Sequence, residues 1–148
     1  MIGHMSKLSI VFEPYAGTVA RDAVDEIINR RNIAITGHDE WYPVAFFLKD
    51  DAGEIFGGLL GNIWAKRMYI ATLAVREPQR GHGYGTQLME RAEHYALGKG
   101  CVGSWLSTFS FQARPFYERL GYADIGIRVP FPPNPTMQVV VMARRLES

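Results

Sequence analysis

The chain has 148 residues and a net charge of +1, with 47% hydrophobic and 21% charged residues. This length suits one domain with its own core, and the near-neutral charge offers no bulk attraction to nucleic acid or to a membrane surface. Cys101 is the only cysteine, which excludes an intramolecular disulfide and a cysteine metal cluster. Residues 1–5 fit a cloning remnant or a disordered start and lack the pattern of a signal peptide. We therefore expect residues 6–148 to form a single cytoplasmic domain.

The first half of the chain predicts a strand, a helix and a hairpin, in that order. The apolar run over residues 7–15 predicts a short strand, and apolar residues at helical spacing predict a helix over 18–30. Residues 31–43 show no such spacing and are expected to be irregular. The segment 43–64 predicts two strands joined by a turn at 50–53, where aspartates and a glycine favour a turn.

The second half predicts further strands around two helices. The nearly apolar run 67–75 is expected to be a central strand buried on both faces. The next helix is marked by apolar residues on one face and by glycines past its end: Leu88, Met89, Ala92, Ala96, Gly98 and Gly100. A strand over 101–109 and a short helix within 112–122 should follow. Strands over 123–129 and 136–146 flank a proline-rich loop.

This order of elements predicts a mixed α/β sheet and not a regular doubly wound fold. We expect about seven strands with helices on both faces of the sheet. The strands between residues 43 and 75 should form a largely antiparallel meander. The strand–helix–strand unit from Met68 to Phe109 should be a right-handed parallel crossover.

A glycine-rich loop, Arg80 to Thr86, lies between a predicted strand and a predicted helix. Gly81, Gly83 and Gly85 leave its backbone bare, and the first N–H groups of a helix have no partner within the helix. An anion such as a phosphate or pyrophosphate therefore suits this loop, with the Arg80 charge beside it. The loop lacks the lysine of a P-loop and the third glycine position of a dinucleotide fingerprint. A tight turn that binds no ligand is the simpler alternative.

Two motifs resemble the GNAT superfamily of N-acetyltransferases, which transfer an acetyl group from acetyl-CoA to an amine. Arg80–Gly81–His82–Gly83–Tyr84–Gly85 is similar to the pyrophosphate loop of that family, Gln/Arg-x-x-Gly-x-Gly/Ala. Downstream, "ARPFYERLGY" over 113–122 resembles the family motif Ala-x-x-Phe-Tyr-x-x-x-Gly-Phe/Tyr. The resemblance covers most of the chain from about residue 43 onward. It implies a GNAT-like fold and one N-acetyltransferase domain.

The resemblance also implies which molecules the protein meets. Acetyl-CoA would be the co-substrate, with no metal, and a primary amine of a small molecule or peptide would be the acceptor. Neither nucleic acid nor a membrane is an expected partner, whereas a homodimer is a family-level expectation.

The resemblance further implies a set of residues that contact the cofactor. The end of the strand from Leu73 to Val75 would splay open at a bulge, so that its backbone pairs with pantetheine and polarises the thioester carbonyl. Many members have an asparagine where this chain has Ser110, which leaves Ser110 and Gln112 as alternative pantetheine contacts. The cofactor-binding set is Leu73, Ala74, Val75, Arg80, Gly81, His82, Gly83, Tyr84, Gly85, Thr86, Ser110, Gln112 and Phe116.

Tyr117 is the predicted general acid for the departing thiolate, since a phenol near pKa 10 stays protonated until a thiolate needs its proton. A tyrosine that only packs on a helix face is the alternative for this residue. The general base stays unassigned; its candidates are His38, Asp39, Glu40 and Glu77, while His82 and His94 are expected at the surface. Aromatic residues that suit an amine acceptor are Trp41, Tyr42, Trp64 and Phe131. A place in the core or at a dimer interface is the alternative for Trp41 and Trp64.

Two other functions fit the same residues. A module that senses acetyl-CoA without turnover would need the loop but no base. A protein that binds another phosphate ligand would need both motifs to coincide by chance.

Overall fold

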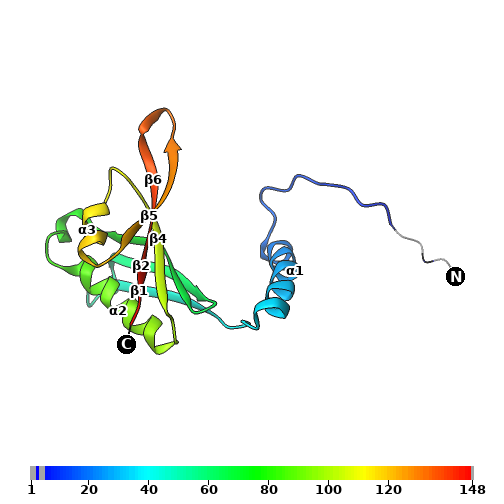
Figure 1. The fold of residues 1–148 in the computed structure, drawn as a ribbon, viewed down its shortest axis with the longest axis horizontal. Helices are drawn as coiled ribbons and strands as arrows, with labels where there is room; N and C mark the ends of the chain where they lie inside the picture. The colour runs from blue at the N-terminus through cyan, green and yellow to red at the C-terminus, as the bar shows by residue number, and fades with distance from the viewer. Residues whose placement is uncertain (1–2, 4–5, 148) are drawn as a thin grey trace. The chain divides into compact units, whose positions relative to one another are not determined.

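The computed structural model describes residue 3 and residues 6–147, apart from the side chains of Phe131, Asn134 and Pro135. The chain divides into two units, 1–37 and 38–148, and each is described by itself. Figure 1 shows the fold as a ribbon.

The first unit contains one helix, α1 (Thr18–Thr36), and no strand among its described residues. The predicted strand over 7–15 is wrong: Leu8, Ile10 and Phe12 are exposed there, and no described strand pairs with them. An extended segment without a pairing neighbour has no ladder to stabilise it. The irregular segment predicted from residue 31 is also wrong up to Thr36. Helix growth adds one hydrogen bond per residue, and α1 continues until Gly37, whose φ of 72° forms the cap.

The second unit is built on one six-stranded sheet with the order β1-β2-β3-β4-β6-β5. Its strands are β1 (Trp41–Lys49), β2 (Ile55–Trp64), β3 (Arg67–Val75), β4 (Gly103–Phe109), β5 (Ala123–Phe131) and β6 (Asn134–Arg145). The mixed α/β architecture is confirmed. The sheet has six strands instead of the expected seven because residues 7–15 do not form the predicted strand.

The pairing of the strands follows the predicted order closely. β1, β2 and β3 form the antiparallel meander, and Gly53 N–H donates to the Asp50 carbonyl in the predicted turn, at 3.0 Å. β3 and β4 pair in parallel across the connecting helix, as predicted. The handedness of this crossover stays a prediction.

The helices of this unit lie on one side of the sheet, to its left in Figure 1. They are α2 (Tyr84–Gly98) and α3 (Arg114–Arg119), preceded by a 3-10 turn, η1 (Glu77–Gln79). Leu88, Met89, Ala92 and Ala96 of α2 are buried in the core, as their spacing predicts. Gly98 is the last residue of α2 and does not lie past it; Gly100, with φ of 78°, follows the end. No helix among the described residues is long and apolar enough to span a membrane.

Within this unit the central strand β3 has buried residues only in its first half, so the prediction that the whole strand is buried on both faces is wrong. Met68 and Ile70 are 0% and 3% exposed, whereas Ala71 and Thr72 are exposed. The change occurs where β3 loses its neighbour, because pairing with β4 ends at Ile70. This loss of pairing creates the candidate site.

Candidate active site

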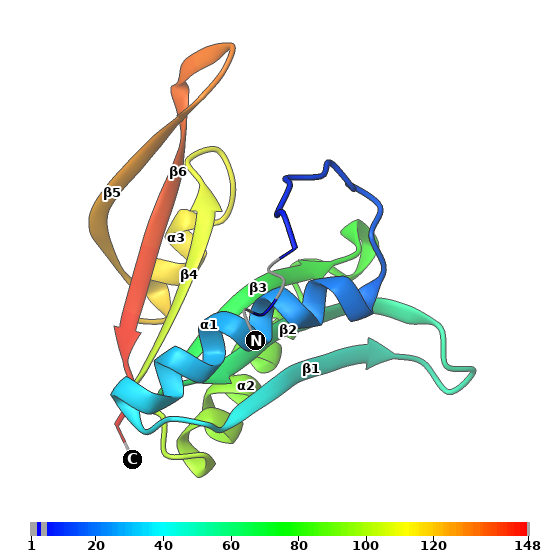
Figure 2. The same ribbon diagram turned by 90° about the vertical axis from the view of Figure 1, so that its right-hand side faces the viewer.

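Strands β3 and β4 run apart at their carboxyl ends. They pair from Arg67–Gly103 to Ile70–Leu106, yet β3 continues to Val75 and β4 to Phe109. Figure 2 shows the two strands separating. On the other side of β3 the register shifts by one residue, which leaves Ala71 as a bulge opposite β2. A bulge bends its strand, so the sequence places the opening correctly but the bulge lies before Leu73, not within Leu73–Val75.

A cavity of about 310 Å³ occupies the opening between the strands. Its walls come from both strands, the loop after β4, α3 and β6. The lining residues are Ile70, Ala71, Thr72, Leu73, Leu106, Ser107, Thr108, Phe109, Gln112, Tyr117 and Val139.

The peptide groups of Leu73 and Val75 face this opening. Arg76 N–H donates to the Phe56 carbonyl on β2 at 2.8 Å. Peptide groups alternate in direction along an antiparallel pair, so those of Leu73 and Val75 point away from β2. The Val75 carbonyl accepts a hydrogen bond from Arg80 Nε at 2.9 Å. Leu73 N–H therefore faces the cavity, where the described part of β4 supplies no ladder partner.

The glycine loop ends in the first turn of α2, next to the end of β3. Gly81 and Gly83 have φ of 81° and 82°, which side chains with a Cβ rarely adopt. A Cβ at Gly81 would meet nothing within 4 Å, and one at Gly83 would meet only Gln87 Nε2 at 4.0 Å. The first hydrogen bond of α2 runs from Gln87 N–H to the Gly83 carbonyl. The N–H groups of residues 84–86 consequently have no acceptor within the helix and suit an anion.

Gly85 has a different role from the other two glycines. A Cβ there would lie 3.3 Å from the ring of Phe116. Glycine at position 85 therefore lets α3 approach α2, so the packing of these two helices is the reason for this glycine. Phe116 lies behind the loop in this arrangement.

Tyr117 of α3 lines the cavity and is 7% exposed. Its ring contacts the rings of Phe116 and Tyr122 edge-on, at centroid distances of 5.1 and 6.1 Å. Burial raises the pKa of the Tyr117 phenol above its ordinary value. The phenol is therefore protonated at neutral pH. None of the described residues forms a hydrogen bond with its hydroxyl, which leaves that proton available to a ligand.

The two alternative pantetheine contacts occupy different environments. Gln112 is part of the cavity wall. Ser110 is paired with β6: its N–H donates to the Gln138 carbonyl at 2.8 Å, and its Oγ accepts from Gln138 N–H at 3.0 Å. Gln112 Oε1 in turn accepts a hydrogen bond from Phe109 N–H at 3.5 Å, so what distinguishes the two residues is that only Gln112 lines the cavity.

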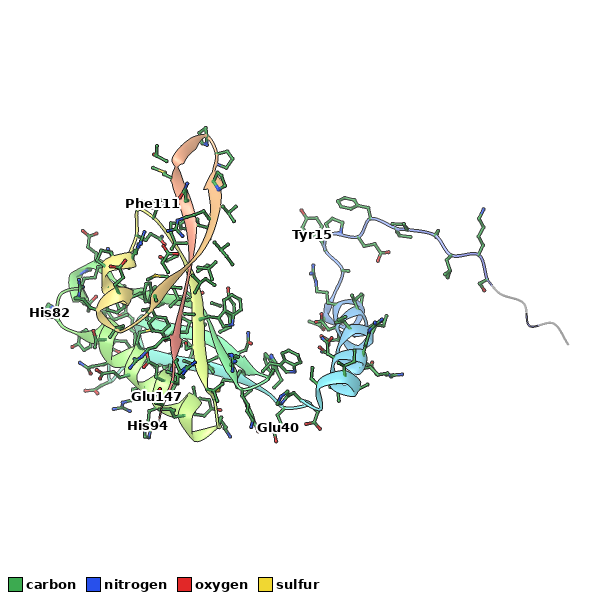
Figure 3. All side chains as sticks on the ribbon, viewed as in Figure 1. Tyr15, Glu40, His82, His94, Phe111 and Glu147 are labelled. Carbon is green, nitrogen blue, oxygen red and sulfur yellow. The ribbon has the colours of Figure 1, made fainter. Side chains whose placement is uncertain are left out.

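The candidate bases lie outside the cavity wall. Glu40 precedes β1, whose first residue Trp41 pairs with Trp64, and Trp64 pairs with Arg67 at the start of β3. The distance from Arg67 to Leu73 along an extended strand is roughly 20 Å, so residues 38–40 lie far from the opening. Figure 3 shows His82 at the outer tip of the glycine loop, Glu40 at a distant end of the unit, and His94 on α2.

Three of the four predicted acceptor residues share this remote position. Trp41, Tyr42 and Trp64 lie at the Arg67 end of the sheet. Phe131 is in β5, and its side chain lies outside the described ones. Glu77, the fourth candidate base, starts η1 and is exposed.

Sequence reasoning missed the polar residues of the cavity wall, Thr72, Ser107 and Thr108. A signal for them exists, because small polar residues at the carboxyl end of a parallel strand lie where α/β sheets bind ligands. Among the described residues, no group of three or more His, Cys, Asp or Glu side chains could hold a metal ion.

An opened pair of parallel strands, with a loop suited to an anion at its mouth and a buried tyrosine in its wall, is an arrangement that suits a phosphate-bearing ligand. Comparison with known proteins agrees with this geometry. The model of the Acetyltransferase (GNAT) family matches residues 10–122. The chain belongs to this family, and it is an acetyltransferase by fold and by relatives.

Two curated relatives and one solved structure illustrate the similarity. An acetyltransferase of Agrobacterium fabrum is 29% identical over 119 residues, which cover 80% of this chain and 87% of the relative. The blasticidin-S acetyltransferase of Streptomyces morookaense is 37% identical over 92 residues, covering 62% and 68%. A crystal structure of an acetyltransferase from Bacillus cereus superposes with a TM-score of 0.76 at 29% identity, covering 92% of this chain and 98% of that one.

Proposed function

We propose that this acetyltransferase moves the acetyl group of acetyl-CoA to a primary amine of a small molecule or peptide by direct attack on the thioester. The observation that carries this proposal is that Leu73 N–H and Tyr117 face one cavity beside the glycine loop. The amine nitrogen forms a bond to the carbonyl carbon, the carbon–sulfur bond breaks, and the thiolate accepts a proton.

The donor is held at both ends of the opening. Its pyrophosphate binds the N–H groups of residues 84–86, with the remaining Arg80 nitrogens beside it. Its pantetheine arm lies along the exposed edge of β3 and takes the place of the missing strand neighbour. This seating brings the thioester carbonyl to Leu73 N–H, which stabilises the negative charge that develops on oxygen.

Tyr117 then supplies the proton to sulfur. Its raised pKa keeps the phenol protonated at neutral pH, and a departing thiolate is a strong enough base to accept a hydrogen bond or a proton from it. The blasticidin-S acetyltransferase among the relatives supports a small-molecule amine as the acceptor.

A second function, a module that binds acetyl-CoA without turnover, is favoured by one observation. The residues that line the cavity include no aspartate, glutamate or histidine that could take a proton from the amine. In the enzyme, the amine must therefore arrive neutral or lose its proton through water. Acetylation of any amine by the purified protein excludes the sensor.

This arrangement predicts a definite pH dependence. The neutral fraction of an amine substrate grows with pH, while a raised folded-state pKa delays the ionisation of Tyr117 to higher pH. We expect kcat/KM to rise from about pH 7 to about pH 9.5 without a descending limb, since an ordinary phenol titrates near 10. Initial rates across this range, with a substrate of known pKa, test it. A loss of activity between about pH 8 and 9 would contradict the assignment of Tyr117.

Calorimetric titration tests the donor site directly. We expect acetyl-CoA to bind with Kd in the range of about 1–100 µM, and pantetheine without the nucleotide to bind at least about tenfold more weakly, because it lacks the pyrophosphate. Equal affinity for both would show that the pyrophosphate does not bind at the glycine loop. Failure of both to bind would overturn the proposed function.

A further inference from the structure

A buried polar cluster lies behind the cavity and has no part in the mechanism above. It consists of Glu93 on α2, Ser104 on β4, Tyr122 after α3 and Arg144 on β6. Glu93, Ser104 and Tyr122 are 8%, 2% and 2% exposed. Three segments of the chain thus direct buried polar side chains to one point of the core, and Arg144, whose side chain is 37% exposed, pairs with Glu93 at the edge of this cluster.

The centre of this cluster is the Tyr122 hydroxyl. Its oxygen lies 3.2 Å from Glu93 Oε1 and 2.9 Å from Ser104 Oγ. A phenol has one proton to donate; that proton can go to the carboxylate while the serine hydroxyl donates its own. The second carboxylate oxygen of Glu93 pairs with Arg144 Nη1 at 2.5 Å. The far end of the Tyr122 ring is therefore fixed by two partners that are themselves held in place.

The ring of Tyr122 also contacts Tyr117. The two rings meet edge-on at 69°, and Tyr122 N–H donates to the Tyr117 carbonyl at 3.0 Å. Tyr117 also meets Phe116, again edge-on, at 72°. Phe116 is only partly buried and has no polar anchor. Of the two rings that flank Tyr117, only Tyr122 is tied by hydrogen bonds.

The Tyr117 hydroxyl has no described hydrogen-bond partner to orient it. Its direction in the cavity must then come from the packing of its ring. A buried ring packed against aromatic neighbours turns only if a neighbour moves, and Tyr122 cannot move without breaking its bonds to Glu93 and Ser104.

We propose that Tyr122, anchored by Glu93 and Ser104, is a positioning residue that holds the Tyr117 phenol toward the thioester. The inference rests on the proposed function, in which Tyr117 donates the proton. The cluster thereby connects the core side of α2, β4 and β6 with the reacting end of the cavity.

A double-mutant experiment tests the proposal. Tyr122→Phe keeps the ring and removes its anchor, and it should lower kcat roughly tenfold, since small misplacements of a catalytic group cost up to about 10²-fold. KM for acetyl-CoA should stay within about twofold of the wild-type value, because Tyr122 does not contact the proposed acetyl-CoA site. In the Tyr117→Phe background the same change should lower kcat no further. A merely structural contribution would lower kcat equally in both backgrounds, and that result would overturn the proposal.

Two further variants complete the design. Tyr95→Phe removes the hydroxyl of a tyrosine whose ring contacts Phe46, outside the cavity wall, and should leave kcat unchanged. Ser104→Ala removes only one of the two anchors and should lower kcat in the same direction by a smaller factor; it replaces Tyr122→Phe if that variant does not fold. If Tyr117→Phe itself retains full turnover, the assignment of the acid fails and the positioning role fails with it. If only Tyr117→Phe is impaired, the proposed function stands and the positioning role is wrong.

Discussion

Replacing Tyr117 by phenylalanine should lower kcat by about 10²-fold or more, the typical contribution of a general acid. The phenol is 7% exposed, lines the cavity and keeps its proton because burial raises its pKa. Phenylalanine fills nearly the same space between Phe116 and Tyr122, so the packing of α3 should persist. Steady-state kinetics should show the loss in kcat, while calorimetric affinity for acetyl-CoA should change by less than about threefold.

The matched control is Tyr95→Phe, which removes a hydroxyl from α2 outside the cavity wall. It should leave kcat and KM unchanged. Full turnover by Tyr117→Phe over the whole pH range would show that water or the amine itself protonates the thiolate. A parallel loss of acetyl-CoA affinity would instead make Tyr117 a binding residue.

Replacing Gly83 by valine should weaken acetyl-CoA binding by more than about 10²-fold, because a charge-assisted hydrogen bond is worth about 1.5–3 kcal/mol and more than one would be lost. Within the protein a Cβ at Gly83 meets only Gln87 Nε2, at 4.0 Å. A branched side chain can therefore be accommodated by the fold, but it occupies the space over the first turn of α2 where the pyrophosphate would lie. Titration of the purified variant with acetyl-CoA measures the effect.

Backbone strain needs its own control, since Gly83 has φ of 82° and valine disfavours that conformation by about 1–2 kcal/mol. Gly100, beyond the other end of α2, has φ of 78° and nothing within 4 Å of a Cβ. Gly100→Val should lower the free energy of unfolding by a similar amount and leave acetyl-CoA binding intact. If both variants bind acetyl-CoA with equal affinity, the phosphate does not bind at the glycine loop.

Several features of this protein follow from short stretches of sequence. The hairpin turn at Asp50–Gly53, the start of α2 after Gly83 and the end of α3 before Gly121 all depend on glycine in turns or left-handed backbone. Such signals act over four or five residues. The glycine loop and the Tyr117 motif are equally local, and so the family and the two ends of the candidate site could be predicted from the sequence.

Other features depend on which segments meet in space. The apolar run over 7–15 looks like a strand, but a strand exists only with a partner, and no described segment pairs with it. Gly85 resembles its neighbours in the loop, yet the approach of Phe116 accounts for it. The bulge at Ala71 arises from the register between β2 and β3.

The class of protein, the candidate donor-binding loop and the candidate acid are thus predictable from sequence, because each is encoded by residues close together in the chain. How the site is assembled depends on the tertiary fold, which separates β3 from β4, turns Leu73 N–H into the opening and keeps residues 38–40 far from it. The same fold brings Glu93, Ser104 and Tyr122 together behind Tyr117. Such contacts join residues that are distant in the chain; Glu93 and Arg144, for example, are 51 positions apart. The pairing of strands and the packing of helices that create these contacts cannot be read from local spacing.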